Sequence, residues 1–197
     1  MAGLLIAFEG LDQSGKQTQA ESLRDYLTSR SRRGHLMSFP DYATAIGQEL
    51  SRALHGERDY AADVMQLLYV ANRYEHRDEI QRWLCEDGIV VCDRYTASSI
   101  AYGEAQDLDA RWLAEIQRFL PPANLIFLLD IDPATAVQRK AAGRDRYESD
   151  LALLARVRDS YRRQAQDARW VVLDGEQSQA HIATAVVEAV AKALDRS

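Results

Sequence analysis

The feature that most constrains the fold is a glycine-rich segment between a short apolar run and a helical pattern. Leu4–Phe8 is apolar, and residues 10–16 follow it in the pattern G-x-x-x-x-G-K. A strand before and a helix after this pattern are the context in which it forms a phosphate-binding loop. Its glycines let backbone amides turn inward, the helix N-terminus adds partial positive charge, and Lys16 adds a full charge. We therefore expect the phosphates of ATP to bind here, and a plain glycine-rich turn is the alternative.

The rest of the chain alternates short apolar runs with longer helical patterns, which is typical of a parallel sheet with crossover helices. The expected strands are Leu4–Phe8, Leu36–Phe39, Ile89–Cys92, Leu125–Ile131 and Trp170–Leu173. The expected helices span about 15–30, 45–55, 62–86, 109–119, 133–142, 150–168 and 179–195. No repeat, low-complexity tract or linker divides the 197 residues, so the sequence predicts one α/β domain.

Composition excludes several other classes of protein. A net charge of −6 argues against nucleic-acid binding by a basic surface. Apolar runs such as Leu125–Leu129 are far shorter than the ~20 residues that span a membrane. The start of the chain has no basic segment of a secretory signal. Cys85 and Cys92 are too few for a disulfide framework and suit a reducing cytoplasm, where we expect the protein to work.

A second constellation follows the apolar run at residues 89–92. Asp93 and Arg94 fall at the carboxyl end of this expected strand, the edge at which open α/β sheets bind ligands. Asp93 could hold Mg²⁺, directly or through water, and Arg94 could bind a second phosphate. A purely structural Asp–Arg pair is the alternative.

Two further segments carry candidate binding residues. Tyr69 and Arg73 are four residues apart on an expected helix, so they share one face and offer an aromatic plane and a guanidinium. Phe39, followed by Pro40, ends another expected strand and could line the same pocket. Either aromatic residue could instead belong to the core.

Taken together, these segments resemble the thymidylate kinase family across nearly the whole chain. The matching segments are Phe8–Asp12, the glycine-rich loop, Phe39-Pro40, Leu68–Glu75, Asp93–Tyr95 with Ser98–Tyr102, and Arg144–Glu148. The resemblance implies a three-layer P-loop kinase fold, with a five-stranded parallel sheet flanked by helices and a short arginine-rich lid at about 140–150. It also implies a homodimer, for which helices at about 62–86 and 96–119 are candidates, and the reaction ATP + dTMP → ADP + dTDP.

The resemblance also implies roles for individual residues. Tyr69 would stack on thymine, Arg94 would bind the acceptor phosphate, Tyr102 would help exclude ribonucleotides, and Arg139 would pack on adenine. The residues expected to bind ATP are Gly10, Leu11, Asp12, Gln13, Ser14, Gly15, Lys16, Gln17, Thr18 and Arg139. Those expected to bind dTMP are Glu9, Asp12, Phe39, Tyr69, Arg73, Arg94, Ser99 and Tyr102. Lys16, Arg94, Arg144 and Arg146 are the expected catalytic residues, and Asp93 and Asp12 the candidate Mg²⁺ ligands.

The sequence departs from the family pattern at three places. Gln13 stands where many relatives have a basic residue, and Lys140, Arg144 and Arg146 of the lid could supply that charge instead. Asp41 and Tyr42 follow the Phe-Pro motif where an arginine is common. Gln17 replaces the usual Ser or Thr ligand of Mg²⁺, with Thr18 one place later.

Other functions remain open at this point. One alternative is another P-loop kinase that acts on a deoxynucleoside or a different nucleotide. A second is a nucleotide-binding protein with reduced catalysis, which Gln17 favours, whereas Lys16, Asp93, Arg94 and the lid arginines argue against it.

Overall fold

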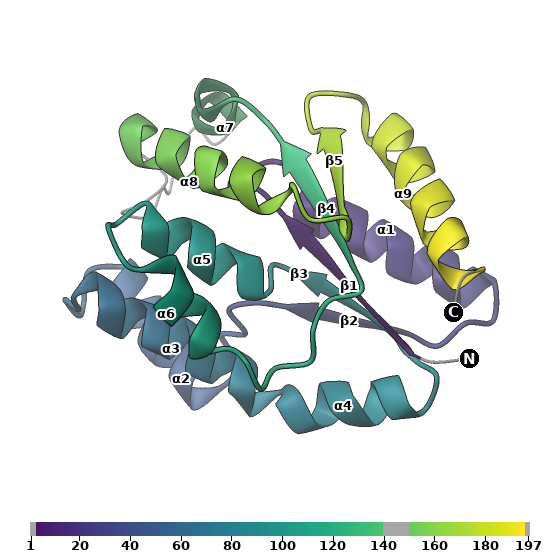
Figure 1. Ribbon diagram of the computed structural model, residues 1–197, viewed down its shortest axis with the longest axis horizontal. Coiled ribbons are helices and arrows are strands. Elements are labelled where there is room, and N and C mark those ends of the chain that lie inside the picture. The colour runs from purple at the N-terminus through teal and green to yellow at the C-terminus, as the bar shows by residue number, and fades with distance from the viewer. Residues whose placement is uncertain (1–2, 140–149, 196–197) are drawn as a thin grey trace.

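The computed structural model describes residues 3–139 and 150–195, and it is built on a parallel sheet (Figure 1). The strands are β1 (Leu4–Glu9), β2 (Gly34–Ser38), β3 (Ile89–Asp93), β4 (Leu125–Asp130) and β5 (Trp170–Asp174). The five strands run in the order β2-β3-β1-β4-β5, and every neighbouring pair is parallel. The expected five-stranded parallel sheet is therefore confirmed, with each strand found within two residues of its predicted bounds.

Helices occupy most of the remaining described chain. They are α1 (Lys16–Ser29), α2 (Ala45–Leu54), α3 (Ala62–Glu75), α4 (Arg77–Cys85), α5 (Thr96–Glu104), α6 (Ala110–Glu115), α7 (Pro133–Arg139), α8 (Leu151–Gln164) and α9 (Gln179–Leu194). None of the helices within residues 3–139 and 150–195 combines the length and apolar character needed to cross a membrane. Lys140, Arg144 and Arg146 of the expected lid lie outside these described residues.

The prediction of one helix over 62–86 was wrong, because the chain breaks at His76 between α3 and α4. The segment 96–119 likewise contains two helices, since Asp107 adopts a left-handed backbone with φ 66° between α5 and α6. Asp109 then caps α6 by accepting a hydrogen bond from the amide of Trp112. Such capping residues favour a new helix start over continuation of the old helix.

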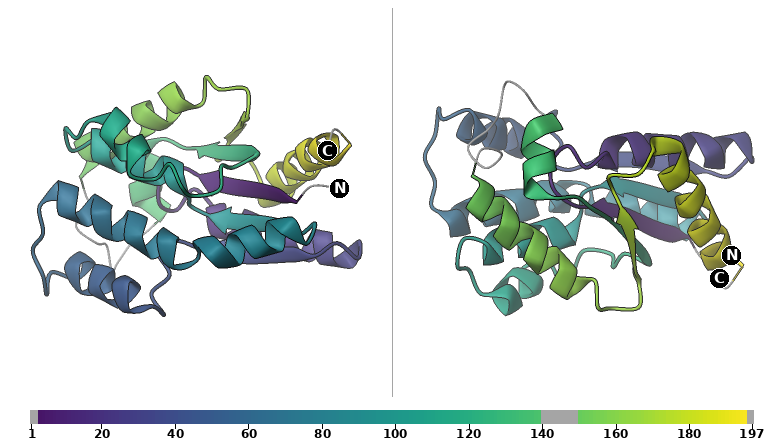
Figure 2. Two further views of the ribbon diagram at one scale, coloured as in Figure 1. Left: turned by 60° about the horizontal axis from the view of Figure 1, so that its bottom comes forward. Right: turned by 90° about the horizontal axis from the view of Figure 1, so that it is seen from above.

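Helices cover both faces of the sheet, which gives the three layers expected for this fold (Figure 2). Alternate residues of β1 serve the two faces, because side chains point to opposite sides along a strand. Leu4, Ile6 and Phe8 pack with α1 and α9, whereas Leu5 and Ala7 belong to the cluster that contains Ile80 of α4. A further cluster joins α5 and α8 to β4 on that second face.

The sheet brings the two sequence constellations together at one edge. β1 pairs with β3 in a register that sets Phe8 beside Asp93, so the loop after β1 lies next to Asp93 and Arg94. β4 borders β1 on the other side. Ligands of open parallel sheets bind at the carboxyl ends of the strands, and two cavities of the described part of the chain open at this edge.

Gly10 begins the loop after β1 and allows a backbone conformation that other residues disfavour. Its φ is 140°, and a Cβ atom added there would lie 2.5 Å from the carbonyl oxygen of Leu129. Gly56, at the exposed end of α2, also has positive φ (80°), but an added Cβ would meet nothing within 4 Å.

We predict that Gly10→Ala lowers the free energy of unfolding by about 3 kcal/mol or more, because backbone strain and a backbone clash add together. Gly56→Ala is the matched control, because it introduces backbone strain without a clash. It should lower the free energy of unfolding by about 1–2 kcal/mol. Urea denaturation of both variants measures the difference. Equal losses would show that the close approach to Leu129 carries no energetic weight.

Candidate active site

The loop between β1 and α1 forms a compact cradle around its own lysine. Gln13 and Gly15 adopt left-handed backbones with φ of 64° and 94°, and α1 starts at Lys16. The Lys16 side chain is buried, and its ammonium donates a hydrogen bond of 2.7 Å to the carbonyl oxygen of Leu11. Successive inward amides, a helix N-terminus and an ammonium are the groups that bind phosphate oxygens.

Burial and neighbouring charges make Lys16 an unusual lysine. Loss of hydration and the nearby Arg94 guanidinium together lower its pKa to about 8, although Asp12 and Asp93 oppose the shift. A phosphate group that binds beside Lys16 would therefore stabilise the charged form of this lysine.

A polar cavity opens over this loop. It is lined by Asp12, Gln13, Ser14, Gly15, Lys16, Gln17, Thr18, Gln19, Phe39, Asp93, Arg94, Arg139, Gly175, Gln177, Gln179 and Ile182. Most residues expected to bind ATP line it, apart from Gly10 and Leu11, which shape the loop from beneath. Arg139 donates hydrogen bonds of 3.1 Å to the carbonyl oxygens of Gln13 and Gly175, so it joins the loop to the turn after β5.

The polar cavity offers one carboxylate that fits a hard cation such as Mg²⁺. The Asp93 Oδ1 atom is buried and has no hydrogen-bond partner among the described residues. Gln17 does not replace the missing Ser or Thr ligand, since its amide donates to Glu21 on the exposed side of α1. The described residues contain no group of three or more potential metal ligands. An Mg²⁺ ion here would therefore need phosphate oxygens and water beside Asp93, as Mg²⁺ commonly does.

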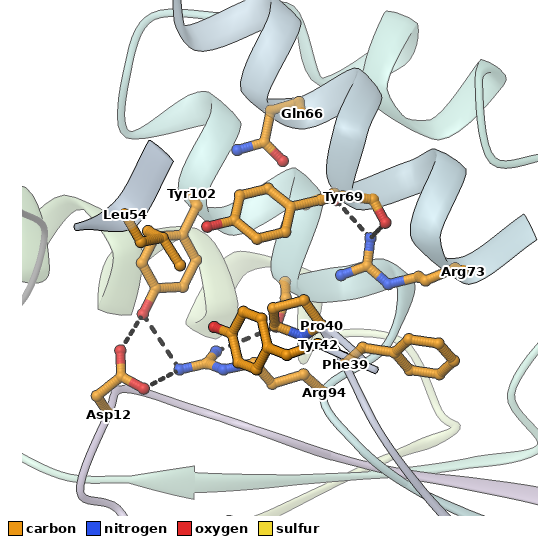
Figure 3. A pocket seen from close by; sticks show the side chains of 12 residues that line it. Asp12, Phe39, Pro40, Tyr42, Leu54, Gln66, Tyr69, Arg73, Arg94 and Tyr102 are labelled. Atoms are coloured by element: carbon orange, nitrogen blue, oxygen red, sulfur yellow. Dashed lines mark hydrogen bonds and ion pairs between the residues drawn. The ribbon is translucent and has the colours of Figure 1, made fainter. Parts of the chain in front are cut away.

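A second pocket, shown in Figure 3, shares the lining residues Asp12, Phe39 and Arg94 with the polar cavity. It is lined by Asp12, Phe39, Pro40, Tyr42, Leu54, Gln66, Tyr69, Arg73, Arg94, Ser98, Ser99 and Tyr102. Gln66, Tyr69 and Arg73 lie along α3 on one side, and Asp12 and Arg94 lie on the opposite side. This arrangement combines an aromatic ring, an amide and two guanidinium groups, which suits a planar base that carries an anionic group.

Arg94 stands where the two cavities meet. Its guanidinium forms a 2.7 Å ion pair with Asp12, and the Tyr102 hydroxyl donates to the other carboxylate oxygen at 3.0 Å. Burial alone would raise the pKa of Asp12, but Arg94 and Lys16 hold it well below its usual range. Burial also opposes the charge of Arg94, yet Asp12 raises its pKa well above the usual value. Both groups are therefore charged at neutral pH.

Arg73 is held from the side of α5. It is buried, and it donates hydrogen bonds to Ser99 Oγ at 2.7 Å and to the Tyr69 carbonyl oxygen at 3.3 Å. Burial lowers its pKa, with Glu9 as the main opposing charge. Ser99 therefore supports Arg73 besides lining the pocket.

Asn72 fastens the loop after β2 to α3. Its buried amide accepts a 2.8 Å hydrogen bond from the Asp41 amide and donates to the Asp41 carbonyl oxygen (3.2 Å) and to Thr44 Oγ1 (2.9 Å). His76 adds an ion-pair contact of 3.0 Å to Asp41 when it is protonated. The loop carries Phe39, so these contacts fix the separation of two pocket walls.

Glu9, which was expected among the dTMP-binding residues, is buried behind the lining of the two cavities. It lines neither cavity, its side chain is 0% exposed, and chain groups already donate to both carboxylate oxygens. Glu9 points to the same sheet face as Leu5 and Ala7, and the hydrogen bonds from Tyr95, Ser98 and Tyr161 cover its carboxylate there. The sequence placed it near the site without indicating the side of the sheet.

The sequence missed several lining residues. Gln66 could have been found, since it lies three residues before Tyr69 and seven before Arg73 on the same helix face. Tyr42 and Leu54 gave no such signal, and neither did Gly175, Gln177 or Gln179. Their positions depend on how distant segments pack.

Comparisons with known proteins agree with this geometry. The profile of the family described as Thymidylate kinase matches residues 8–186. The chain is similar to thymidylate kinase of Plasmodium falciparum, with 33% identity over 191 residues that cover 96% of this chain and 90% of that protein. It is also 33% identical over 193 residues to thymidylate kinase of Schizosaccharomyces pombe, covering 95% and 91%. A solved structure of thymidylate kinase from Candida albicans superimposes with a TM-score of 0.84 at 28% identity, covering 100% and 94%.

We predict that binding of ADP weakens as the pH rises through about 8, where Lys16 loses its proton in the free protein. Below that pH the ammonium attracts the phosphates, and above it the neutral amine does not. Calorimetric titration from about pH 6 to about pH 9.5 measures the effect. Lys16→Arg is the control, because arginine stays charged and its affinity for ADP should not fall above about pH 8. An affinity in the unaltered chain that changes above about pH 8 no more than that of Lys16→Arg would contradict the assignment.

Proposed function

The chain belongs to the thymidylate kinase family, and from this membership we infer that it transfers the γ-phosphoryl group of ATP to dTMP, giving ADP and dTDP. The observation that carries the inference is the meeting of two cavities at Asp12 and Arg94. One cavity surrounds a phosphate-binding loop, and the other combines an aromatic ring with two guanidinium groups. A donor and an acceptor bound there would present their phosphates to the same arginine.

The reaction needs alignment and charge stabilisation more than proton transfer. A dTMP phosphate oxygen is already anionic near neutral pH, so we assign no general base. Lys16 and Arg94 would neutralise the charge that develops on the transferring phosphoryl group. Exclusion of water from the site would prevent ATP hydrolysis.

We propose the following roles in the acceptor pocket. Tyr69 stacks on thymine, and Arg73 binds near the base and the phosphate. Asp12 lies near the 3′-hydroxyl of the sugar. Tyr102, whose hydroxyl donates to Asp12, fills the space that a ribose 2′-hydroxyl would need. The proximity of these side chains in one pocket supports the set.

We propose that ATP binds with Mg²⁺ through Asp93, whose unpartnered buried oxygen has the chemistry of a Mg²⁺ ligand. Asp12 is the weaker candidate, because Arg94 and Tyr102 already bind its two oxygens. Mg²⁺ would supply charge neutralisation on the donor phosphates. Arg139 would pack on adenine.

Residues 1–197 would form one kinase domain, with Arg144 and Arg146 of a lid at about 140–150 adding positive charge in catalysis. The family resemblance supports a homodimer, with the segments at about 62–86 (α3 and α4) and 96–119 (α5 and α6) as candidates for its interface. The two free cysteines are consistent with a cytoplasmic enzyme.

The substrate assignment is tested by measuring ADP release with dTMP, dUMP, dCMP, AMP and thymidine as acceptors, with and without Mg²⁺. We expect dTMP to give the highest kcat/KM and omission of Mg²⁺ to abolish turnover. A preference for AMP or thymidine would identify a different kinase of the same fold. Nucleotide binding without turnover on any acceptor would identify a protein with reduced catalysis.

We predict that Lys16→Ala lowers kcat by more than ~100-fold, the scale of losing one preorganised charge contact. Lys192→Ala is the control, since this lysine is exposed on α9 away from both cavities. The same ADP-release assay measures both variants. Near-normal turnover of Lys16→Ala would refute the role of the loop.

We predict that Asn72→Ala raises the KM for dTMP about tenfold, equivalent to about 1.4 kcal/mol, because the loop that carries Phe39 loses its attachment to α3. The KM for ATP should stay nearly constant. Asn124→Ala is the matched control, since Asn124 also fixes backbone, accepting from the Leu5 amide at 2.8 Å, but lies at the other end of the sheet. An equal rise in both KM values would indicate general loss of structure.

A further inference from the structure

Glu9 is a fully buried carboxylate whose use is not explained by substrate binding. Oε1 accepts a 2.8 Å hydrogen bond from the Tyr95 amide, and Oε2 accepts from Ser98 Oγ at 2.6 Å and from the Tyr161 hydroxyl at 3.1 Å. No arginine or lysine in the described part of the chain forms an ion pair with it. Burial of a carboxylate is expensive unless hydrogen bonds compensate it. Three donors from two segments, the start of α5 and the helix α8, meet that need, and all three lie around Arg94.

The backbone of Arg94 is held on both sides by the end of β1. Arg94 adopts a left-handed conformation with φ 64°, which non-glycine residues rarely keep without support. Its own amide donates to the Phe8 carbonyl oxygen at 2.9 Å. The next amide, that of Tyr95, donates to Glu9. Phe8 and Glu9 therefore hold the two amides that flank the strained residue.

The side chain of Arg94 depends on the same carboxylate. Its Nη1 atom donates to Ser98 Oγ at 3.2 Å and to the Tyr161 hydroxyl at 3.3 Å. Ser98 Oγ donates to Glu9, and the Tyr161 hydroxyl, which lies 2.8 Å from Ser98 Oγ, shares its single proton between Glu9 and Ser98. Both oxygens keep lone pairs that accept from Arg94, so the Glu9 carboxylate orients two hydroxyls, and these hydroxyls orient the guanidinium toward the junction of the cavities.

We propose that Glu9 is a positioning residue that acts on the transferred phosphate only through Arg94. The proposal rests on the role of Arg94 in the phosphoryl transfer inferred above. Tyr161 brings α8 into this hydrogen-bond network, although it lies 152 residues from Glu9 in the sequence. In Glu9→Gln, the amide NH₂ group faces the hydroxyls as a donor and takes up lone pairs that otherwise serve Arg94.

The direct test is the effect of Glu9→Gln on the two kinetic constants. We expect kcat to fall about 10- to 100-fold, the range for misplacing a group that aligns the reaction. The KM for ATP should stay within about twofold, because the contacts of the phosphate loop are untouched. Tyr161→Phe removes one hydroxyl and should lower kcat in the same direction by less. If Glu9→Gln does not fold, Tyr161→Phe still tests the proposal.

A double-mutant cycle separates positioning from general support of the fold. In an Arg94→Ala background, Glu9→Gln and Tyr161→Phe should produce no further loss of kcat, since the residue on which they act is gone. Losses of kcat that multiply in the double variants would overturn the proposal. Ser160→Ala is the matched control. This buried hydroxyl precedes Tyr161 and donates to Glu104, away from Arg94, so its loss should change stability and leave kcat intact.

A readout without turnover keeps the inference separate from the proposed function. The guanidinium NMR signals of Arg94 should be resolved in the unaltered chain and broadened in Glu9→Gln, whatever the substrate. Unchanged Arg94 signals in Glu9→Gln would overturn the positioning role. Absence of dTMP phosphorylation by the unaltered chain would instead refute the proposed function.

Discussion

The parallel pairing of β1 with β3 is the contact on which the rest of the site depends. Its register sets Phe8 beside Asp93, so the phosphate-binding loop and Arg94 meet although 84 residues separate Gly10 from Arg94. The Arg94 guanidinium then donates to the Gly10 carbonyl oxygen, which fastens the two segments at the cavity edge. A one-residue slip of this pair would turn every β1 side chain to the opposite face. The hydrophobic patterns of both faces therefore protect the geometry of the site.

Charge balance explains how so many ionised groups are tolerated in this part of the molecule. Arg94 and Lys16 both lower the pKa of Asp12, and Asp12 in turn raises the pKa of both of these groups. Asp12 offsets part of the positive charge that the phosphate-binding groups supply. The site is consequently held together by its own ions before any nucleotide binds, and phosphate groups enter an environment whose dipoles are already oriented.

Local patterns made much of this structure predictable. Five apolar runs gave the five strands, and the spacing of Gly10, Gly15 and Lys16 gave the loop, because both signals lie within a few residues. The break at His76 and the separate helix α5 were not predicted from the sequence. The contacts of Glu9 also could not be predicted from the sequence. Its partners Tyr95 and Tyr161 are 86 and 152 residues away, so only the folded chain identifies them.

The ion pair between Arg94 and Asp12 has a consequence for selectivity. In the free protein the Arg94 guanidinium is already paired with the Asp12 carboxylate. A ligand therefore binds Arg94 only if it offers an anionic group that interacts more strongly than this carboxylate does. A phosphate, with its double charge and three oxygens, competes with a carboxylate for two guanidinium nitrogens. An uncharged nucleoside has no anionic group that could replace Asp12, so the ion pair between Arg94 and Asp12 stays intact. On the proposed role of Arg94, the protein thus distinguishes nucleotides from nucleosides by whether the acceptor can replace Asp12 at Arg94. This selection by charge does not depend on the base of the acceptor.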